Sequence, residues 1–157
     1  MKFFDEGESL TNDTIDALEK NVGKPLPPEY RTFLLAHNGG RPEAAIVDID
    51  DCPQGASSVQ IFLGVTGPVE SETLEWSWNC FQGRIDARLF PVADDPFGNL
   101  FCLSLDGDDR GQVFFLDRYE DSPRPYLVAG SWNEFLDKLR AYTPEERAVI
   151  DGATHNR

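Results

Sequence analysis

The stretch Leu26–Pro42 reads LPPEYRTFLLAHNGGRP and carries a helix start, a buried stripe and a helix stop in one short segment. Pro28 suits the first helical position, where the missing N–H costs nothing and the fixed φ is already helical. The residues that would face a core recur with helical spacing, namely Tyr30, Phe33, Leu34 and His37. The run Asn38-Gly39-Gly40 tolerates positive φ and predicts the end of the helix.

A second helix is predicted just before this stretch, over residues 12–22. Three apolar residues lie at helical spacing there: Ile15, Leu18 and Val22. Thr11 or Asn12 suits its N-terminal cap, and Gly23 suits its C-terminal end. The short link over 24–27 would then fold the two helices into an antiparallel hairpin that covers an apolar surface.

That surface should be a sheet. Alternating apolar residues predict strands over 45–49 and 58–65, with turn residues between them. Four more strands are predicted from short apolar runs between tight polar turns, at 89–93, 100–105, 113–117 and 126–129. This spacing is typical of an antiparallel meander.

The remaining segments are predicted to be helical. In 69–81, Leu74, Trp78 and Phe81 have helical spacing. Capping boxes at 131–134 and 143–146 start two helices near the end, and residues 152–157, which have nothing to bury, are expected to fray. We therefore predict one α+β domain over residues 1–157, with a mostly antiparallel sheet and helices from both ends of the chain packed around it.

Four segments, taken in order, resemble the SUKH superfamily, whose founding members are the Smi/Knr cell-wall regulators of fungi. The first is the opening stretch, where the shared residues are Leu26, Pro27, Tyr30, Phe33, Leu34, Asn38, Gly39 and Gly40. The others are the strand at 89–94 with the turn at Gly98, the strand that follows Gly111, and the helix at 131–136, where Trp132 replaces the more usual Phe. The resemblance covers about residues 10–140 and implies the same α+β class.

Charge and length exclude several classes of function. The net charge of −14 and the pI of about 4.4 argue against nucleic-acid binding, which depends on Lys and Arg, and against anionic membranes. No apolar run approaches the length of about eighteen residues that a membrane span needs. Acids also occupy the N-terminal region where a signal peptide would be apolar. We expect a cytoplasmic protein, with a monomer favoured.

No catalytic residue, metal or cofactor is predicted. The two histidines are His37, beside a helix end, and His155, near the C-terminus, and no nucleophile-elbow, zinc-protease or phosphate-loop motif occurs. The three cysteines, Cys52, Cys80 and Cys102, fit neither a disulfide framework nor a metal pattern, although a Cys–His nucleophile pair stays open.

The segment Asp106–Asp117 approaches a calcium-binding EF-hand loop. It departs from one because Arg110 occupies the fifth place, Asp117 replaces the bidentate Glu, and the flanks are predicted strands. An acidic β-turn explains these residues more simply.

The interval between Arg41 and Arg84 contains not one Lys or Arg. Its acidic and aromatic residues are the predicted partner-binding residues: Asp48, Asp50, Asp51, Glu70, Glu72, Glu75, Trp76 and Trp78. Acidic charge would speed encounter with a basic protein, and the tryptophans would anchor it. The alternative, in which the tryptophans belong to the core and the acids are only solvated, stays open.

The resemblance also implies a function. Bacterial SUKH proteins typically act as immunity proteins that block the toxins of polymorphic or contact-dependent systems. It therefore implies stoichiometric binding to a cognate basic toxin, a nuclease or deaminase, by a protein that is not an enzyme. The alternative is a non-catalytic regulatory or scaffold module that binds cellular proteins, as in the fungal relatives.

Overall fold

The computed structural model describes residues 1–121 and 123–155, and side chains as far as Val149. Its elements, in chain order, are β1 (Phe3–Phe4), α1 (Asn12–Val22), α2 (Pro28–Ala36), β2 (Arg41–Pro42), β3 (Ile46–Asp48), β4 (Ala56–Ser58), β5 (Ile61–Phe62), the 3-10 helix η1 (Glu70–Glu72), α3 (Leu74–Phe81), β6 (Leu89–Asp94), β7 (Leu100–Ser104), β8 (Val113–Leu116), β9 (Pro125–Ala129), α4 (Trp132–Lys138) and α5 (Pro144–His155).

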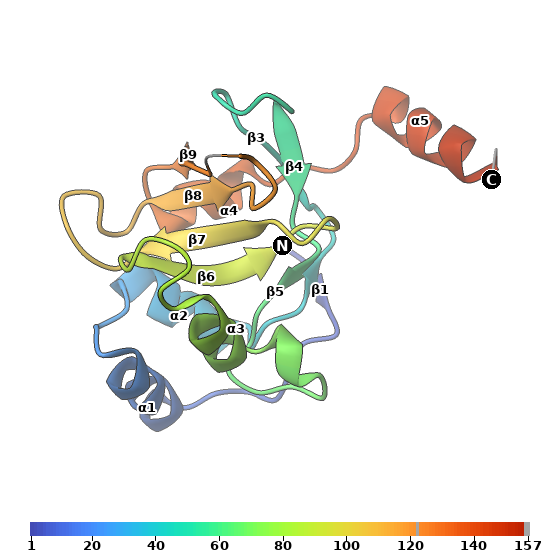
Figure 1. The fold of residues 1–157 in the computed structure, drawn as a ribbon. Helices are drawn as coiled ribbons and strands as arrows, with labels where there is room; N and C mark the ends of the chain where they lie inside the picture. Colours follow the sequence, from blue (N-terminus) through green and yellow to red (C-terminus); the bar gives the residue numbers. More distant parts are fainter. Residues whose placement is uncertain (122, 156–157) are drawn as a thin grey trace.

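The centre of the molecule is an antiparallel sheet with the strand order β5-β6-β7-β8-β9 (Figure 1). Each strand pairs with the next one along the chain, so the predicted meander and the predicted α+β class are confirmed. Two small antiparallel pairs, β1–β2 and β3–β4, lie beside it. None of the described helices has the length and apolar character needed to cross a bilayer.

The central strands bury side chains on both faces. In β7, Phe101 and Leu103 belong to the large cluster with α1, α2 and α4, whereas Leu100 and Cys102 face a smaller cluster on the other side. Alternation with a period of two places successive residues on opposite faces. The smaller cluster is covered by Phe81 at the end of α3 and by the segment that follows it.

The predicted ends of α1 and α2 are also present. Thr11 caps α1 by accepting a hydrogen bond from the backbone N–H of Thr14 at 3.3 Å, and Gly23 ends the helix with a φ of 83°. Pro28 is the first residue of α2, and His37 is its C-terminal cap. Trp132 of α4 packs edge-on against Tyr30 with a centroid distance of 4.7 Å, which fastens the two helices together.

Two elements that the sequence predicts as continuous are each divided into two in the structure, the strand at 58–65 and the helix at 69–81. The predicted strand at 58–65 is wrong as a single strand, because β4 pairs with β3 whereas β5 pairs with β6. The chain leaves one sheet and joins another at Val59 and Gln60, whose N–H groups bond to Ala45 and Asp94. The predicted helix at 69–81 consists of η1 followed by α3, with Thr73 between them as the N-cap of α3.

The C-terminal helix α5 projects from the body of the molecule (Figure 1). The sequence predicts fraying from Gly152 onward, but the backbone is helical as far as His155. Residues 156–157 lie outside the described part of the chain. Arg140 ties the start of α5 to the hairpin β3–β4, since its guanidinium lies 2.8 Å from Glu146 and 3.0 Å from Asp48.

Candidate functional site

The predicted partner-binding residues are divided between two ends of the molecule. The hairpin β3–β4 lies at the top of the view in Figure 1, whereas η1 and α3 lie below the sheet. The interval between Arg41 and Arg84, which has no Lys or Arg, is therefore continuous in sequence but does not form one surface. The structure brings together Glu70, Glu75 and Trp76, and it places Asp50 and Asp51 elsewhere.

The first group lines an open groove of about 660 Å³ along η1 and α3, which we name the acidic groove. Its residues are Val65, Glu70, Thr73, Glu75, Trp76, Asn79 and Cys80. Trp76 is 40% exposed, so its indole ring is available to a partner. Within the described chain, no Lys or Arg lies within ion-pair distance of Glu70 or Glu75.

The backbone of the acidic groove is held by Thr73. Its hydroxyl donates to the carbonyl of Glu70 at 2.7 Å and accepts from the N–H of Trp76 at 3.3 Å. The N–H of Leu74 also bonds to the carbonyl of Gly64 at 2.8 Å, which joins α3 to the strand region. Glu70, Glu75 and Trp76 therefore project from a fixed frame.

Glu72 does not point into the groove. Its carboxylate lies 3.6 Å from Arg41, which also contacts Asp5. Asp48 is neutralised in a similar way by Arg140, whose hydrogen bond lowers the pKa of the Asp48 carboxyl. These two predicted residues are thus engaged within the protein. Asp50 and Asp51 are exposed at the tip of the β3–β4 hairpin.

The prediction that Trp78 anchors a partner is wrong, because its side chain is buried. It is only 9% exposed, and its ring packs edge-on against Phe90 at a centroid distance of 5.6 Å. The reason is helical phase, because Leu74, Trp78 and Phe81 form the buried face of α3. For Trp78 the alternative reading, a core tryptophan, is the correct one.

Sequence reasoning missed Asn79 and Cys80 as groove residues. They follow Trp76 by three and four positions, so all three share one face of α3. That spacing was available in the sequence. Val65 comes from a different segment, and only the folded chain brings it to the groove.

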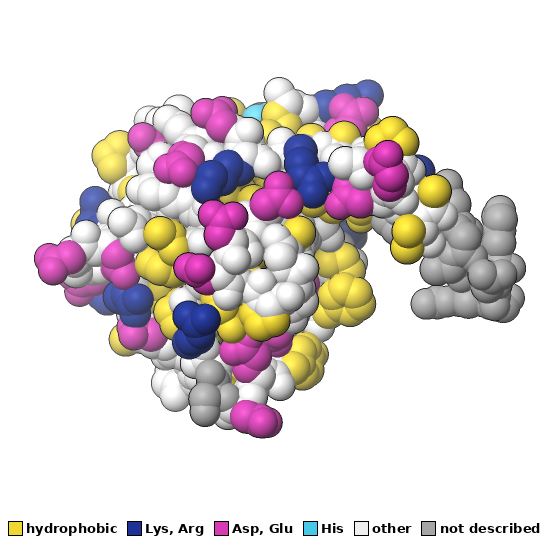
Figure 2. All heavy atoms as spheres, turned by 90° about the horizontal axis from the view of Figure 1, so that it is seen from above, with side chains coloured by type: hydrophobic (Ala, Val, Ile, Leu, Met, Phe, Trp, Pro, Cys, Tyr) yellow, Lys and Arg dark blue, Asp and Glu magenta, His cyan; other side chains and the backbone are white. Residues whose placement is uncertain are grey.

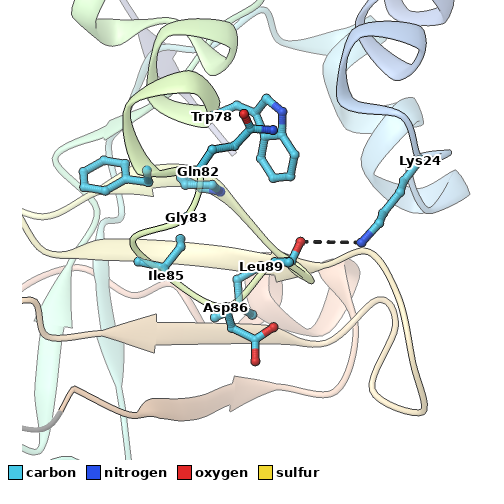
Figure 3. A pocket seen from close by; sticks show the side chains of 10 residues that line it. Lys24, Trp78, Gln82, Gly83, Ile85, Asp86 and Leu89 are labelled. Atoms are coloured by element: carbon cyan, nitrogen blue, oxygen red, sulfur yellow. Dashed lines mark hydrogen bonds between the residues drawn. The ribbon is translucent and has the colours of Figure 1, made fainter.

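A second cavity, of about 500 Å³, lies on the other side of α3 (Figure 3). Its walls are mainly apolar, from Trp78, Phe81, Ile85, Leu89 and Pro91. Lys24 closes one side, with its ammonium 3.5 Å from the carbonyl of Ala87 and 3.5 Å from Asp106. The cavity can accept an apolar group, and its two charged lining residues are paired with residues outside it, Lys24 with Asp106 and Asp86 with Arg88.

The groups considered for catalysis have structural partners. The His37 ring packs against Phe3 at a centroid distance of 4.1 Å, and its Nδ1 contacts Glu6. Cys52 and Cys102 are buried, and burial raises the pKa of the Cys102 thiol. The side chain of His155 lies outside the described part of the chain.

The EF-hand-like residues lie on either side of β8. Asp106 is in the turn before this strand and contacts Lys24, whereas Asp117 follows the strand and accepts hydrogen bonds from Gln54 and Tyr119. Over residues 1–121 and 123–149, no three His, Cys, Asp or Glu side chains converge as a metal site.

These features define a small α+β domain with an acidic, aromatic-bearing groove beside an antiparallel meander. The chain belongs to the SMI1 / KNR4 family (SUKH-1), which matches residues 9–138. The expected superfamily is thereby confirmed. The chain is also similar to the SPbeta prophage-derived uncharacterized protein YokK of Bacillus subtilis (strain 168), with 24% identity over 145 residues that cover 82% of this chain and 74% of that protein.

Proposed function

We propose that this chain is an immunity protein that binds a basic toxin domain stoichiometrically and blocks its substrate-binding surface. Membership of the SUKH-1 family and the similarity to a prophage-derived protein support an immunity-type role. The observation that carries the proposal is the acidic groove, where Glu70 and Glu75 flank the exposed ring of Trp76. The protein acts by binding and not by bond chemistry.

The toxin class is the one that the family resemblance implies, and charge supports it. A nuclease or a nucleic-acid deaminase presents Lys and Arg to its substrate, because phosphate contacts supply much of the affinity for nucleic acids. A chain with a net charge of −14 attracts such a surface. Occupying the basic surface would exclude the nucleic acid and leave the toxin inactive.

The two kinds of groove residue have different roles. An exposed ion pair at 4 Å contributes only about 1 kcal/mol in water, so Glu70 and Glu75 mainly raise the association rate. Trp76 offers a large rigid side chain that a partner can bury, and such residues dominate the binding energy of protein interfaces.

Co-expression in a bacterial host with a toxin domain encoded beside the gene tests this proposal. Wild-type protein should restore growth, and the purified pair should form a one-to-one complex that weakens as salt rises. Loss of rescue, or the recovery of several chaperone or signalling partners instead of one basic protein, would favour the regulatory alternative.

Charge-matched variants locate the contact. Glu70→Gln with Glu75→Gln should reduce the association rate about tenfold at low salt. Asp108→Asn with Asp137→Asn removes the same charge from exposed positions outside the groove and should have little effect. Equal losses in both pairs would show that net charge, and not the groove, is responsible.

A further inference from the structure

Two aromatic side chains stand out from the surface at one end of the sheet. Phe97 is 75% exposed and Tyr119 is 71% exposed. Phe97 lies in the turn between β6 and β7, and Tyr119 follows β8. The two turns are neighbours, since a Cβ built on Gly98 would lie 3.3 Å from the hydroxyl of Tyr119.

The Phe97 turn is fixed from below by Asp95, which is only 2% exposed. Its carboxylate accepts hydrogen bonds from the N–H of Phe97 at 2.9 Å, the N–H of Asn99 at 2.8 Å and the side-chain amide of Asn99 at 3.1 Å. It also accepts from the hydroxyl of Ser57 at 3.0 Å. A carboxylate with four donors holds the turn in one conformation.

The Tyr119 turn is fixed in the same manner. Asp117 accepts from the N–H of Tyr119 at 2.9 Å and from the side-chain amide of Gln54 at 3.0 Å. Arg118 joins the two turns by donating to the carbonyl of Gly98 at 2.8 Å. Gln54 lies in the turn between β3 and β4, and Ser57 lies in β4, so the hairpin is tied to both turns.

The surface made by these turns is acidic as well as aromatic. Asp50 and Asp51 are exposed at the hairpin tip, and Asp121 is exposed two residues after Tyr119. Arg118 places its guanidinium 4.9 Å from the centre of the Phe81 ring and 5.7 Å from the centre of the Tyr119 ring, so this cation is already stacked against aromatic side chains. In Figure 2, which looks down on the molecule from the hairpin side, acidic side chains lie among hydrophobic ones and several Lys and Arg side chains.

Exposed rings on fixed turns have the properties of binding anchors. An apolar side chain of this size gains free energy when a partner removes it from water, and a rigid turn loses little entropy on binding. Neither ring contributes to the core clusters, and the hydrogen bonds that fix the turns are made by other groups. Core packing does not account for aromatic residues at these positions.

We infer that this sheet-end surface, made of Phe97, Tyr119, Asp50 and Asp51, makes a second anchoring contact with the basic toxin domain, with both rings entering apolar pockets rimmed by Lys or Arg. The inference rests on the proposed function and names a contact outside the acidic groove. The charges of the surface select a basic partner. They disfavour a second copy of this chain, which would bring like charges together.

The test uses the toxin domain identified by co-expression and measures association and dissociation rates separately. Phe97→Ser and Tyr119→Ser should each raise the dissociation rate at least tenfold and change the association rate less than twofold. Leu35→Ser, at an exposed position on α2, is the control and should change neither rate. Thermal unfolding should be nearly unchanged in Phe97→Ser and Tyr119→Ser, whose side chains are mostly exposed, and slightly lowered in Leu35→Ser, whose side chain is 38% exposed and lies within a helix.

The possible failures are distinguishable. If wild-type protein does not bind the toxin domain, both the proposed function and this inference are overturned. If the wild type binds and the serine variants dissociate at the wild-type rate, the inference alone is overturned and the proposed function stands. A rise in dissociation rate of the same size for Leu35→Ser would also overturn the assignment to the sheet end.

Discussion

The side-chain oxygen of Asn38 accepts a hydrogen bond of 2.8 Å from the backbone N–H of Val65, which lies 27 residues further along the chain. The amide nitrogen of Asn38 donates to the carbonyl of Glu8 at 2.8 Å and to the hydroxyl of Thr66 at 2.9 Å. One buried side chain thus joins the N-terminal segment, the end of α2 and the chain leaving β5. This geometry is a physical reason for the Asn in the family motif Asn-Gly-Gly.

Asn38→Asp should destabilise the fold although it preserves size. The carboxylate can still accept the hydrogen bond from the N–H of Val65. Its second oxygen, however, has no proton to donate to the carbonyl of Glu8 or the hydroxyl of Thr66. We expect a loss of about 2–3 kcal/mol in the free energy of unfolding at pH 7, measured by denaturant titration. Asn133→Asp, at an exposed position in α4, is the control. Equal losses would contradict the bridging role of Asn38.

Gly39→Ala should be costly for a reason beyond its φ of 73°. A Cβ at this position would lie 2.9 Å from the N of Gly64 and 2.9 Å from the carbonyl oxygen of Phe62. Gly23→Ala is a matched control, because Gly23 has a φ of 83° with nothing within 4 Å of its Cβ. The control should lose about 1 kcal/mol in free energy of unfolding. Gly39→Ala should lose at least about 2 kcal/mol more, and similar losses would exclude a steric role.

Asp94→Asn should stabilise the protein in a pH-dependent manner. Burial, together with Glu72 and Asp95, raises the pKa of the Asp94 carboxyl from 3.8 to about 6. Its Oδ1 has no hydrogen-bond partner among the described groups. Because the folded state holds this proton more tightly than the unfolded state, its contribution to stability falls as pH rises from about 4 to about 6.

The gain from Asp94→Asn should therefore be largest above pH 6 and vanish near pH 4. Asp94 is partly exposed and solvent screens its charge, so we expect a gain of only about 1 kcal/mol at pH 7.5. Thermal melts of wild type and variant across this pH range provide the measurement. A gain that does not change with pH would argue against titration of Asp94.

Trp132→Phe should be tolerated, whereas Trp132→Ala should not. The indole is 1% exposed, and its Nε1 finds no acceptor among the described residues. Phe leaves a cavity but removes an unsatisfied donor, so the two effects oppose each other and the change should stay within about 1.5 kcal/mol. Ala should cost about 3–5 kcal/mol in free energy of unfolding. Comparable losses for the two variants would show that the indole ring itself is required.

Local patterns were sufficient for much of the fold. The ends of α1 are encoded by Thr11 and Gly23, and the meander follows from polar turns between apolar runs, so each feature could be predicted from adjacent residues. The division of the predicted strand 58–65 at Val59 could not be predicted from adjacent residues. A strand that leaves one sheet for another keeps its alternation, and only the hydrogen-bond partners reveal the change.

The candidate site was predictable in part. Glu70, Glu75 and Trp76 are close in sequence and share one groove, but their separation from Asp50 and Asp51 depends on the path of the chain through β5. The sheet-end surface has a weaker local signal, because Phe97 and Tyr119 come from different turns. What joins them is Arg118, whose partner Gly98 is 20 residues earlier in the chain.

The smaller cluster on the second face of the sheet has a thin cover. The segment 82–88 passes over it with a cavity of about 500 Å³ on one side and another of about 480 Å³ on the other. A cover with empty space on both flanks can detach while the large cluster stays intact, which is a sub-global opening of low free energy. Hydrogen–deuterium exchange should therefore label the backbone amides of segment 82–88 long before those of β7. When the temperature rises, water should reach the second face of the sheet before it reaches the large cluster.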